Sequence, residues 1–453
     1  MKRKTERYDR PKVITVGDII KRAAILLGIK MQRANKNDAV RVAVGDWAEE
    51  WWRTHVKPSF EREHGARVDI TSLDYWSLLT AVLTNQSSKH PYDIVMVHNT
   101  WMHSLINYLV DITRPLVKER DDFLQGVWKT FAEVTKGKVY GVPYTTDVRL
   151  LYWHKDMFKA AHERGYLPST EPPKDWQAVF VYTRGLRRAI SDKLIQAEFP
   201  MVLAVTPEEK TNCVWMGHFL SRGVSLAGKS PEEFFQLFET SAAADVLEYY
   251  GQLCHSDGGQ LCFPFLDGTF RQMDEQFLRG RFVMVTSSWP YMMVLAKNIL
   301  SLSTSEVEKK FGVTNMPIPS EPPSKKTTVS TGETLVLPKG GKNRTLALDL
   351  LRLVCGQEMQ IQYCKQEGYL PVRQSILRSK ERAKELAAVF PHYQEIVSAL
   401  AYTNFLTYPS GYVEISEILR SLIRDVVRTN PNRQDIDRVL RQAAAKARLA
   451  LTR

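Results

Sequence analysis

The chain has 453 residues, enough for two or three domains of ordinary size, which excludes a single small module. Hydrophobic residues make up 44% of it and charged residues 25%, the composition of a globular protein with no bias toward disorder. No window approaches the run of about 18 apolar residues that a membrane-spanning helix needs, so we expect no integral membrane protein.

The net charge of +12 is concentrated at the two ends of the chain. Residues 1–40 carry eleven Lys and Arg against four Asp and Glu, and residues 420–453 carry nine against three. The ends therefore hold +13, which leaves −1 for everything between them. A nucleic-acid-binding surface would need its basic residues on the body of the protein. We therefore expect no nucleic-acid partner and interpret the basic ends as solvated helix faces.

The N-terminal segment, residues 1–39, is interpreted as a basic extension that contains one helix. Lys2, Arg3 and Lys4 resemble the start of an export signal, but the apolar stretch at 23–29 is short and no small-residue cleavage site follows it. The stretch fits an amphipathic helix over 17–33 better, so the sequence carries no clear signal peptide.

The five cysteines follow no zinc-binding spacing. Cys254 and Cys262 are close enough to form a disulfide across a loop, and buried free thiols are the equal alternative. The redox compartment stays open on this basis.

From residue 41 onward, short apolar runs alternate with helical periodicity, which is typical of an α/β fold. Strands are predicted at 41–44, 66–70 and 93–97, with helices over 46–64 and 75–85 between them. Residues 139–158 form an extended segment that leads into a further strand, and 167–174 and 319–331 have the composition of loops. The C-terminal third is predicted to be helical over 343–368, 379–402, 414–429 and 434–450.

Residues 139–158 also carry a family resemblance. The segment Tyr140-Gly141-Val142-Pro143-Tyr144, followed by Lys155-Asp156-Met157-Phe158, resembles the first crossover of extracellular solute-binding proteins of the sugar-binding type, the relatives of maltose-binding protein. Trp153 and His154 stand where that family usually has Tyr and Asn.

Four further blocks occur in the order of that family. They are Pro173–Trp176, which resembles a helix start; Phe277–Met284 followed by Ser288-Trp289; Ser330–Glu333 followed by Leu335–Lys339; and the turn Gly368–Arg373. The resemblance covers about residues 40–453.

The resemblance implies an α/β protein with a two-lobed, periplasmic-binding-protein-like fold of type II, whose lobes are joined by crossover hinge strands and close on a ligand. Crossovers are expected at 143–147, 286–290 and 330–333. They divide the chain into lobe I, 40–146 plus 288–331, and lobe II, 147–287 plus 332–453. Pro143 fixes one backbone torsion at the first crossover, which suits a strand that bends between lobes.

A sugar site needs flat aromatic rings for the sugar faces and polar groups for the hydroxyl edges. Aromatic residues can equally be plain core, Asp147 can cap its turn, and Glu333 can form a surface ion pair. The ligand-binding candidates follow predicted strands, lie at the crossovers, or add to the aromatic stock: Asp46, Trp47, Asn99, Trp101, Tyr144, Asp147, Trp215, Trp289, Tyr291, Glu333 and Arg373.

One motif favours another class of protein. Gly223–Ser230 fits the P-loop expression, whose backbone amides and Lys229 would hold phosphates. A P-loop follows a buried strand, whereas 213–221 is predicted to be a helix, and Ser230-Pro231-Glu232-Glu233 is a typical helix start. Because no catalytic signature accompanies it, we expect no enzyme, no cofactor and no metal site.

The sequence therefore predicts the solute-binding component of an ABC importer, a monomer that binds a mono- or oligosaccharide and delivers it to a membrane permease. The resemblance implies a periplasmic or cell-surface location. The alternatives are a sensor module of the same fold that is not exported, and a binding protein for a solute that is not a sugar.

Overall fold

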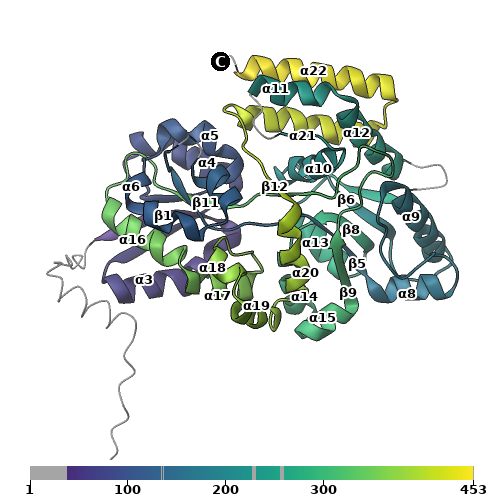
Figure 1. Cartoon of the computed structure of the whole chain (residues 1–453), viewed down its shortest axis with the longest axis horizontal. Coiled ribbons are helices and arrows are strands. Elements are labelled where there is room, and N and C mark those ends of the chain that lie inside the picture. The colour runs from purple at the N-terminus through teal and green to yellow at the C-terminus, as the bar shows by residue number, and fades with distance from the viewer. Residues whose placement is uncertain (1–37, 134, 136, 227–230, 256–259, 452–453) are drawn as a thin grey trace, which may run out of the picture.

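A computed structural model of the chain describes residues 38–451, apart from 134, 136, 227–230 and 256–259. These residues form two lobes, each built on a five-stranded sheet with helices packed around it (Figure 1). The α/β two-lobed architecture expected from the sequence is confirmed. The helix expected over 17–33 lies outside the described residues.

The sheet of lobe I has the strand order β2-β1-β3-β11-β4. Its three parallel strands β1, β2 and β3 confirm the first three predicted strands, and β11 runs antiparallel between β3 and β4. Val42, Ala43 and Val44 of β1 are all buried, as a central strand covered on both faces requires. The bounds are β1 Ala39–Gly45, β2 Arg67–Leu73, β3 Ile94–His98, β4 Gly141–Pro143 and β11 Glu333–Val336.

Helices cover both faces of this sheet. The side chain of Asp74 caps the N-terminus of α4, where it accepts hydrogen bonds from the backbone N–H groups of Trp76 and Ser77. Gly368, with φ of 75°, ends α17 in the left-handed conformation that favours glycine. The helices are α2 Glu49–Trp51, α3 Lys57–His64, α4 Tyr75–Thr84, α5 Met102–Leu105, α6 Thr113–Leu116, α7 Gln125–Val127, α16 Arg344–Val354, α17 Gln357–Glu367 and α18 Gln374–Leu377.

The sheet of lobe II has the order β7-β6-β8-β5-β9, in which β5 runs antiparallel to β8 and to β9. Its bounds are β5 Leu150–His154, β6 Phe199–Ala204, β7 Cys262–Phe265, β8 Phe282–Ser288 and β9 Phe311–Asn315. The helices around it are α8 Lys155–Glu163, α9 Trp176–Ser191, α10 Lys210–Ser221, α11 Pro231–Gln236, α12 Ser241–Cys254, α13 Phe270–Leu278, α14 Tyr291–Leu300 and α15 Thr304–Lys310.

The C-terminal third is helical, as predicted. Its helices are α19 Lys380–Ala387, α20 Tyr393–Ser398, α21 Tyr412–Thr429 and α22 Arg433–Leu451. The last two pack against each other and against α12 of lobe II (Figure 1). A small parallel pair of strands, β10 Thr328–Ser330 and β12 Thr403–Phe405, lies between the two large sheets.

The predicted division into lobes differs from the observed one after residue 287. Residues 288–331 were expected in lobe I, but β9 pairs with β5 and therefore belongs to the sheet of lobe II. Residues from 332 were expected in lobe II, yet β11 pairs with β3 and β4 of lobe I. The segment 286–290 joins β8 to α14 within lobe II and is no crossover. Strand periodicity shows that a segment is buried but not which sheet it joins.

The five cysteines are free and buried, so Cys254 and Cys262 form no disulfide. Burial raises the pKa of the Cys213 thiol to about 12. None of the helices in the described part of the chain is long and apolar enough to cross a membrane.

Candidate functional site

In each lobe, the edge of the sheet at which the parallel strands end faces the segments that connect the lobes. In lobe I, β3 ends at His98, and β11 begins beside it because Glu333 pairs with His98. In lobe II, β8 ends at Ser288, which pairs with Leu150 at the start of β5. Side chains that follow parallel strands gather at such edges, where α/β proteins bind ligands. The crossover segments 144–149 and 330–333 join these two edges.

Asp147 forms contacts with both crossover segments and with a neighbouring aromatic ring. One carboxylate oxygen accepts the backbone N–H of Thr331 at 2.9 Å. The other accepts the indole N–H of Trp289 at 2.6 Å and lies 2.8 Å from Nη1 of Arg149. Arg149 is fully buried and also donates to the Thr331 hydroxyl at 2.6 Å. A single carboxylate therefore holds both crossovers and one aromatic ring in fixed positions.

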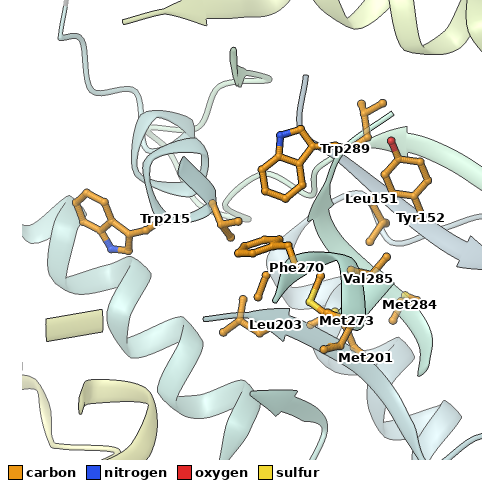
Figure 2. Close-up of a cluster of buried hydrophobic side chains, with 14 of the residues drawn as sticks. Leu151, Tyr152, Met201, Leu203, Trp215, Phe270, Met273, Met284, Val285 and Trp289 are labelled. Carbon is orange, nitrogen blue, oxygen red and sulfur yellow. The ribbon is translucent and has the colours of Figure 1, made fainter. Parts of the chain in front are cut away.

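Two cations lie against the Trp289 ring. The guanidinium carbon of Arg149 is 3.9 Å from the ring centroid, and the ammonium nitrogen of Lys210 is 4.6 Å from it. Phe270 contacts the same ring edge to face, with the ring centroids 4.8 Å apart. The two rings lie near each other in Figure 2. Cations held against aromatic faces keep their charge while losing part of their water.

Four tyrosines form a row that passes from lobe I into lobe II, and we call it the tyrosine row. Tyr144 stacks on Tyr363 with centroids 5.0 Å apart, and Tyr363 stacks on Tyr369 at 5.2 Å and an interplanar angle of 4°. Tyr369 then lies 6.0 Å from Tyr291, at the start of α14 in lobe II. Tyr144, Tyr363 and Tyr291 are buried and Tyr369 is half-buried, so Tyr369 is the ring of the row that is most open to a solute.

Asp274 fixes the lobe II end of the tyrosine row. Its two carboxylate oxygens accept the hydroxyl of Ser288 at 2.7 Å and the hydroxyl of Tyr291 at 2.6 Å. Burial raises the pKa of this carboxyl group to about 6, and the two hydroxyl donors reduce the shift. Asp274 therefore positions Tyr291 from inside lobe II.

The lobe I edge contributes Asn99 and Glu333. The side-chain oxygen of Asn99 accepts the N–H of Gly332 at 3.3 Å, while its amide nitrogen is buried without a hydrogen-bond partner. The Glu333 carboxylate accepts the hydroxyl of Thr145. A Cβ on Gly332 would lie 2.2 Å from the carbonyl oxygen of Thr145, so the two crossovers approach each other too closely for any larger residue.

The structure brings six of the predicted site residues together where the edges of the two sheets meet: Asn99, Tyr144, Asp147, Trp289, Tyr291 and Glu333. Asp46 and Trp47 follow β1 at the same end of the lobe I sheet, where Asp46 is exposed and Trp47 is half-buried. For all eight, contact with a ligand stays a prediction.

Three other candidates each lie within a single lobe, where they pack in its core or bind its own polar groups. Trp101 is buried against Tyr75 in the core of lobe I. Arg373 is held by Asp122, Glu119 and the carbonyl of Cys355, all in lobe I.

Trp215 is the third, and it is fully buried on α10 against Phe219 and Phe238. Its ring lies apart from that of Trp289 in Figure 2. Helical periodicity places a tryptophan on a face of the helix without showing whether that face meets the core or the cleft.

Trp215→Phe is therefore expected to lower the free energy of unfolding by about 1–3 kcal/mol, because it leaves a space in the lobe II core. The dissociation constant of any ligand should stay within twofold of the wild-type value. Chemical unfolding and calorimetric titration of the same preparation would measure the two effects. A large loss of affinity at unchanged stability would contradict the core assignment.

The sequence alone did not single out Lys210, Asp274, Tyr363 and Tyr369. Lys210 is the first residue of α10, which follows β6, and β6 was not among the predicted strands. A buried run such as 200–204 before a lysine at a helix start is the signal that would have found it. Tyr363 and Tyr369 flank the end of α17, where only the fold brings them beside Tyr144.

The P-loop hypothesis requires a buried strand before Gly223, and the described residues there form no strand. The residues before Gly223 form α10 rather than a strand, as the sequence had indicated. Residues 227–230, including Lys229, lie outside the described residues.

Two α/β lobes joined by short crossovers, with aromatic rings and polar groups gathered where the lobes meet, define a hinged solute-binding protein. The chain belongs to the bacterial extracellular solute-binding protein family, whose model matches residues 57–391. Its family is one of solute-binding proteins.

Known relatives agree with this assignment. Two proteins named "Putative binding protein", of Brucella abortus and Brucella suis, are each 23% identical over 442 residues, which cover 94% of this chain and 97% of each relative. A solute-binding protein of Thermotoga lettingae solved with α-D-tagatose is similar in fold, with a TM-score of 0.74, 18% identity and coverage of 92% of this chain and 100% of that one.

Two further solved structures are similar in fold. T. maritima MalE3 with maltose has a TM-score of 0.73 and 17% identity, with coverage of 91% of this chain and 99% of that one. A solute-binding protein of Agrobacterium radiobacter K84 in complex with ribitol has a TM-score of 0.72 and 17% identity, with coverage of 90% and 98%.

Proposed function

We propose that this protein captures a carbohydrate or polyol between its lobes and delivers it to an ABC permease, without performing chemistry on it. The observation that carries the proposal is the tyrosine row, which runs across the boundary between the lobes beside the donors and acceptors of the crossovers. Ring faces would accept the C–H surfaces of the solute, and the polar groups would bind its hydroxyls.

Hinge closure would couple binding to recognition by the permease. A ligand shifts an equilibrium between open and closed forms only by its difference in affinity for the two. A solute between the lobes would contact residues such as Tyr144 and Tyr369 in lobe I and Trp289 in lobe II only in the closed form. The closed form would then be the one that docks on the permease, and we expect the protein to act as a monomer.

The solutes bound by similar structures guide the test, which is a panel of D-tagatose, maltose and ribitol with glycerophosphocholine as the solute that is not a sugar. A ligand present at 100 times its dissociation constant is expected to stabilise the protein by about 2.7 kcal/mol. Thermal unfolding and titration calorimetry would measure this. If no sugar or polyol raised the melting temperature or gave heat, the proposal would fall.

A pair of tyrosine variants ties the response to the site. Tyr369→Ala removes one ring of the tyrosine row, whereas Tyr108→Ala removes a ring that is 40% exposed elsewhere on lobe I. The first variant should weaken binding at least tenfold and the second should leave it unchanged. Equal affinities in both variants would place the ligand elsewhere.

The location would be periplasmic or on the cell surface, as the family description indicates. Cell fractionation separates this proposal from the sensor alternative. Recovery of the protein in the cytoplasmic fraction alone would favour the sensor.

A further inference from the structure

The segment that carries Trp289 has a backbone conformation that its surroundings must hold in place. Ser287, near the end of β8, has φ of 63°, a left-handed conformation that residues other than glycine seldom adopt. Ser288 and Trp289 follow, and α14 begins at Tyr291. Such a conformation persists only where the neighbouring structure determines it. We call residues Ser287–Tyr291 the Trp289 turn.

Asp274 of α13 binds the Trp289 turn on both sides of the tryptophan. Its two carboxylate oxygens accept the hydroxyl of Ser288 at 2.7 Å and that of Tyr291 at 2.6 Å. Asp274 and Ser288 are fully buried and Tyr291 is buried, so water does not compete for these hydrogen bonds. The hydroxyl of Ser287 is buried without a hydrogen-bond partner among the described residues. The side chain of the strained residue therefore does not hold the turn, whereas the carboxylate does.

The same helix packs on the indole ring. Phe270 begins α13 and contacts the Trp289 ring edge to face, with the centroids 4.8 Å apart. Phe270 and Asp274 are four residues apart, so they lie on one face of the helix. The indole N–H of Trp289 donates to Asp147 at 2.6 Å. The helix therefore fixes the backbone of the turn through Asp274 and the ring through Phe270.

The carboxyl group of Asp274 changes its protonation state close to neutral pH. Burial raises its pKa to about 6, and the hydroxyls of Tyr291 and Ser288 oppose this rise. The ammonium of Lys210 also opposes it, whereas the carboxylate of Glu208 adds to it. A small fall in pH is therefore enough to neutralise the group that holds the Trp289 turn.

We propose that Asp274 is the positioning residue of Trp289 and that its negative charge keeps the Trp289 turn in its strained conformation. A carboxylate accepts both hydroxyls in charge-assisted hydrogen bonds. A neutral carboxyl group must donate its own proton and accepts the hydroxyls only in weaker bonds. Uptake of one proton therefore loosens the turn, and solute binding weakens as the pH falls through about 6. This role rests on the proposed function, since Trp289 is the lobe II ring that a solute would meet.

Protonation of Asp274 acts on folding and on binding in opposite directions. The pKa of about 6 in the folded protein lies above the ordinary value of 3.8, so the folded protein binds this proton more tightly than the unfolded chain does. The stability that the proton provides is fully present below pH 3.8 and is lost as the pH rises through about 6. The acidification that weakens binding should therefore stabilise the fold. An aspartate with a structural role alone would leave binding unchanged.

Three other titratable groups near the turn are distinguishable from Asp274. Tyr152 of β5 faces the carboxylate, and burial raises the pKa of Tyr152 well above 10, so it stays neutral. Burial lowers the pKa of His98, at the end of β3, to about 3, so it keeps one form between pH 5 and pH 8. Burial also raises the pKa of Glu333. A variant that changes Asp274 alone separates its effect from that of Glu333.

Asp274→Asn provides this test, because the amide resembles the carboxyl group in shape and does not ionise. Calorimetric titrations at pH 7.5 and pH 5.0 use whichever of D-tagatose, maltose and ribitol binds. The wild type should bind about fivefold more weakly at pH 5.0, the effect expected when charge-assisted hydrogen bonds become neutral ones. Asp274→Asn should bind at both pH values as weakly as the wild type does at pH 5.0. Over the same range, the melting temperature of the wild type should rise relative to that of the variant.

The fluorescence of Trp289 provides a readout that needs no solute. The emission lost on Trp289→Phe is measured between pH 5 and pH 8 in the wild type and in Asp274→Asn. It should change with a midpoint near pH 6 in the wild type and stay constant in Asp274→Asn. Ser288→Ala removes a donor that lowers the pKa of Asp274, so it should move the midpoint to higher pH. If Asp274→Asn did not fold, this shift would decide the matter.

Asp192→Asn is the matched control, since the exposed Asp192 at the end of α9 likewise accepts a tyrosine hydroxyl, that of Tyr166. It should leave the affinity at both pH values unchanged. Equal pH dependence in Asp274→Asn and the wild type, or none in the wild type, would overturn the role of Asp274 while the proposed function stands. If no sugar or polyol bound, the proposed function would fall, and the fluorescence of Trp289 would still decide whether Asp274 positions it.

Discussion

Replacing Arg420 by Met is expected to lower the free energy of unfolding by about 3–5 kcal/mol, because it leaves the Glu209 carboxylate buried without its counterion. Arg420 on α21 and Glu209 before α10 are 2% and 1% exposed, and their charged atoms are 2.7 Å apart. Burial raises the pKa of Glu209, and Arg420 opposes that shift. Urea unfolding at pH 7, followed by circular dichroism, would measure the loss.

The matched control is Arg438→Met on α22, whose ion pair with Asp435 is exposed. Exposed ion pairs contribute about 0–1 kcal/mol, so this variant should differ little from the wild type. The double variant Glu209→Gln with Arg420→Met should recover much of the loss, because no charge is then buried alone. Equal losses for Arg420→Met and Arg438→Met would show that water reaches Glu209.

The same helix contacts both lobes. Arg420 lies 5.0 Å from the Trp76 ring of α4 in lobe I, and the backbone N–H of Gly411 donates to Ser104 of α5 at 3.2 Å. The ion pair with Glu209 fixes α21 on lobe II, so its contacts with lobe I lie across the boundary that hinge motion changes.

The sequence predicted most of the local structure of this fold. The strands at 41–44, 66–70 and 93–97 and the four C-terminal helical segments are present, because each is long enough for its apolar period to be read. The block 173–176 resembled a helix start, and the structure begins α9 there with the Asp175 side chain accepting the backbone N–H of Ala178.

Non-local pairing was the part that local patterns could not predict. β9 joins β5 across more than 150 residues, and β11 joins β3 across more than 230. Both strands are short and buried, so the composition of each fits the sheet of either lobe equally well. The assignment of 288–331 to lobe I failed for this reason.

Site residues were predictable where they lie in the chain next to a recognisable crossover. Asp147 and Glu333 were predicted in this way; the structure bonds Asp147 to Thr331, Trp289 and Arg149, and contact with a ligand stays a prediction. Lys210 was not singled out because only the fold brings it against Trp289. Trp215, four residues further along α10 than Thr211, faces the core instead.

Asp147→Ala is expected to have an effect as large as that of Arg420→Met, and for a related reason. It removes the counterion of Arg149, which is fully buried, together with the acceptor for the Trp289 indole and the Thr331 backbone. Leaving a buried charge unpaired costs about 3–5 kcal/mol. Urea unfolding at pH 7 would measure the fall in the free energy of unfolding.

Asp74→Ala provides the scale for this comparison, since Asp74 is an aspartate whose exposed side chain only caps α4. Its loss should cost about 0.5–2 kcal/mol. The double variant Asp147→Ala with Arg149→Met should be more stable than Asp147→Ala alone, because the unpaired guanidinium is removed with its partner. If Asp147→Ala were no more destabilising than Asp74→Ala, Arg149 would have to be hydrated in the folded protein. The crossovers would then be held together by their backbone contacts rather than by this carboxylate.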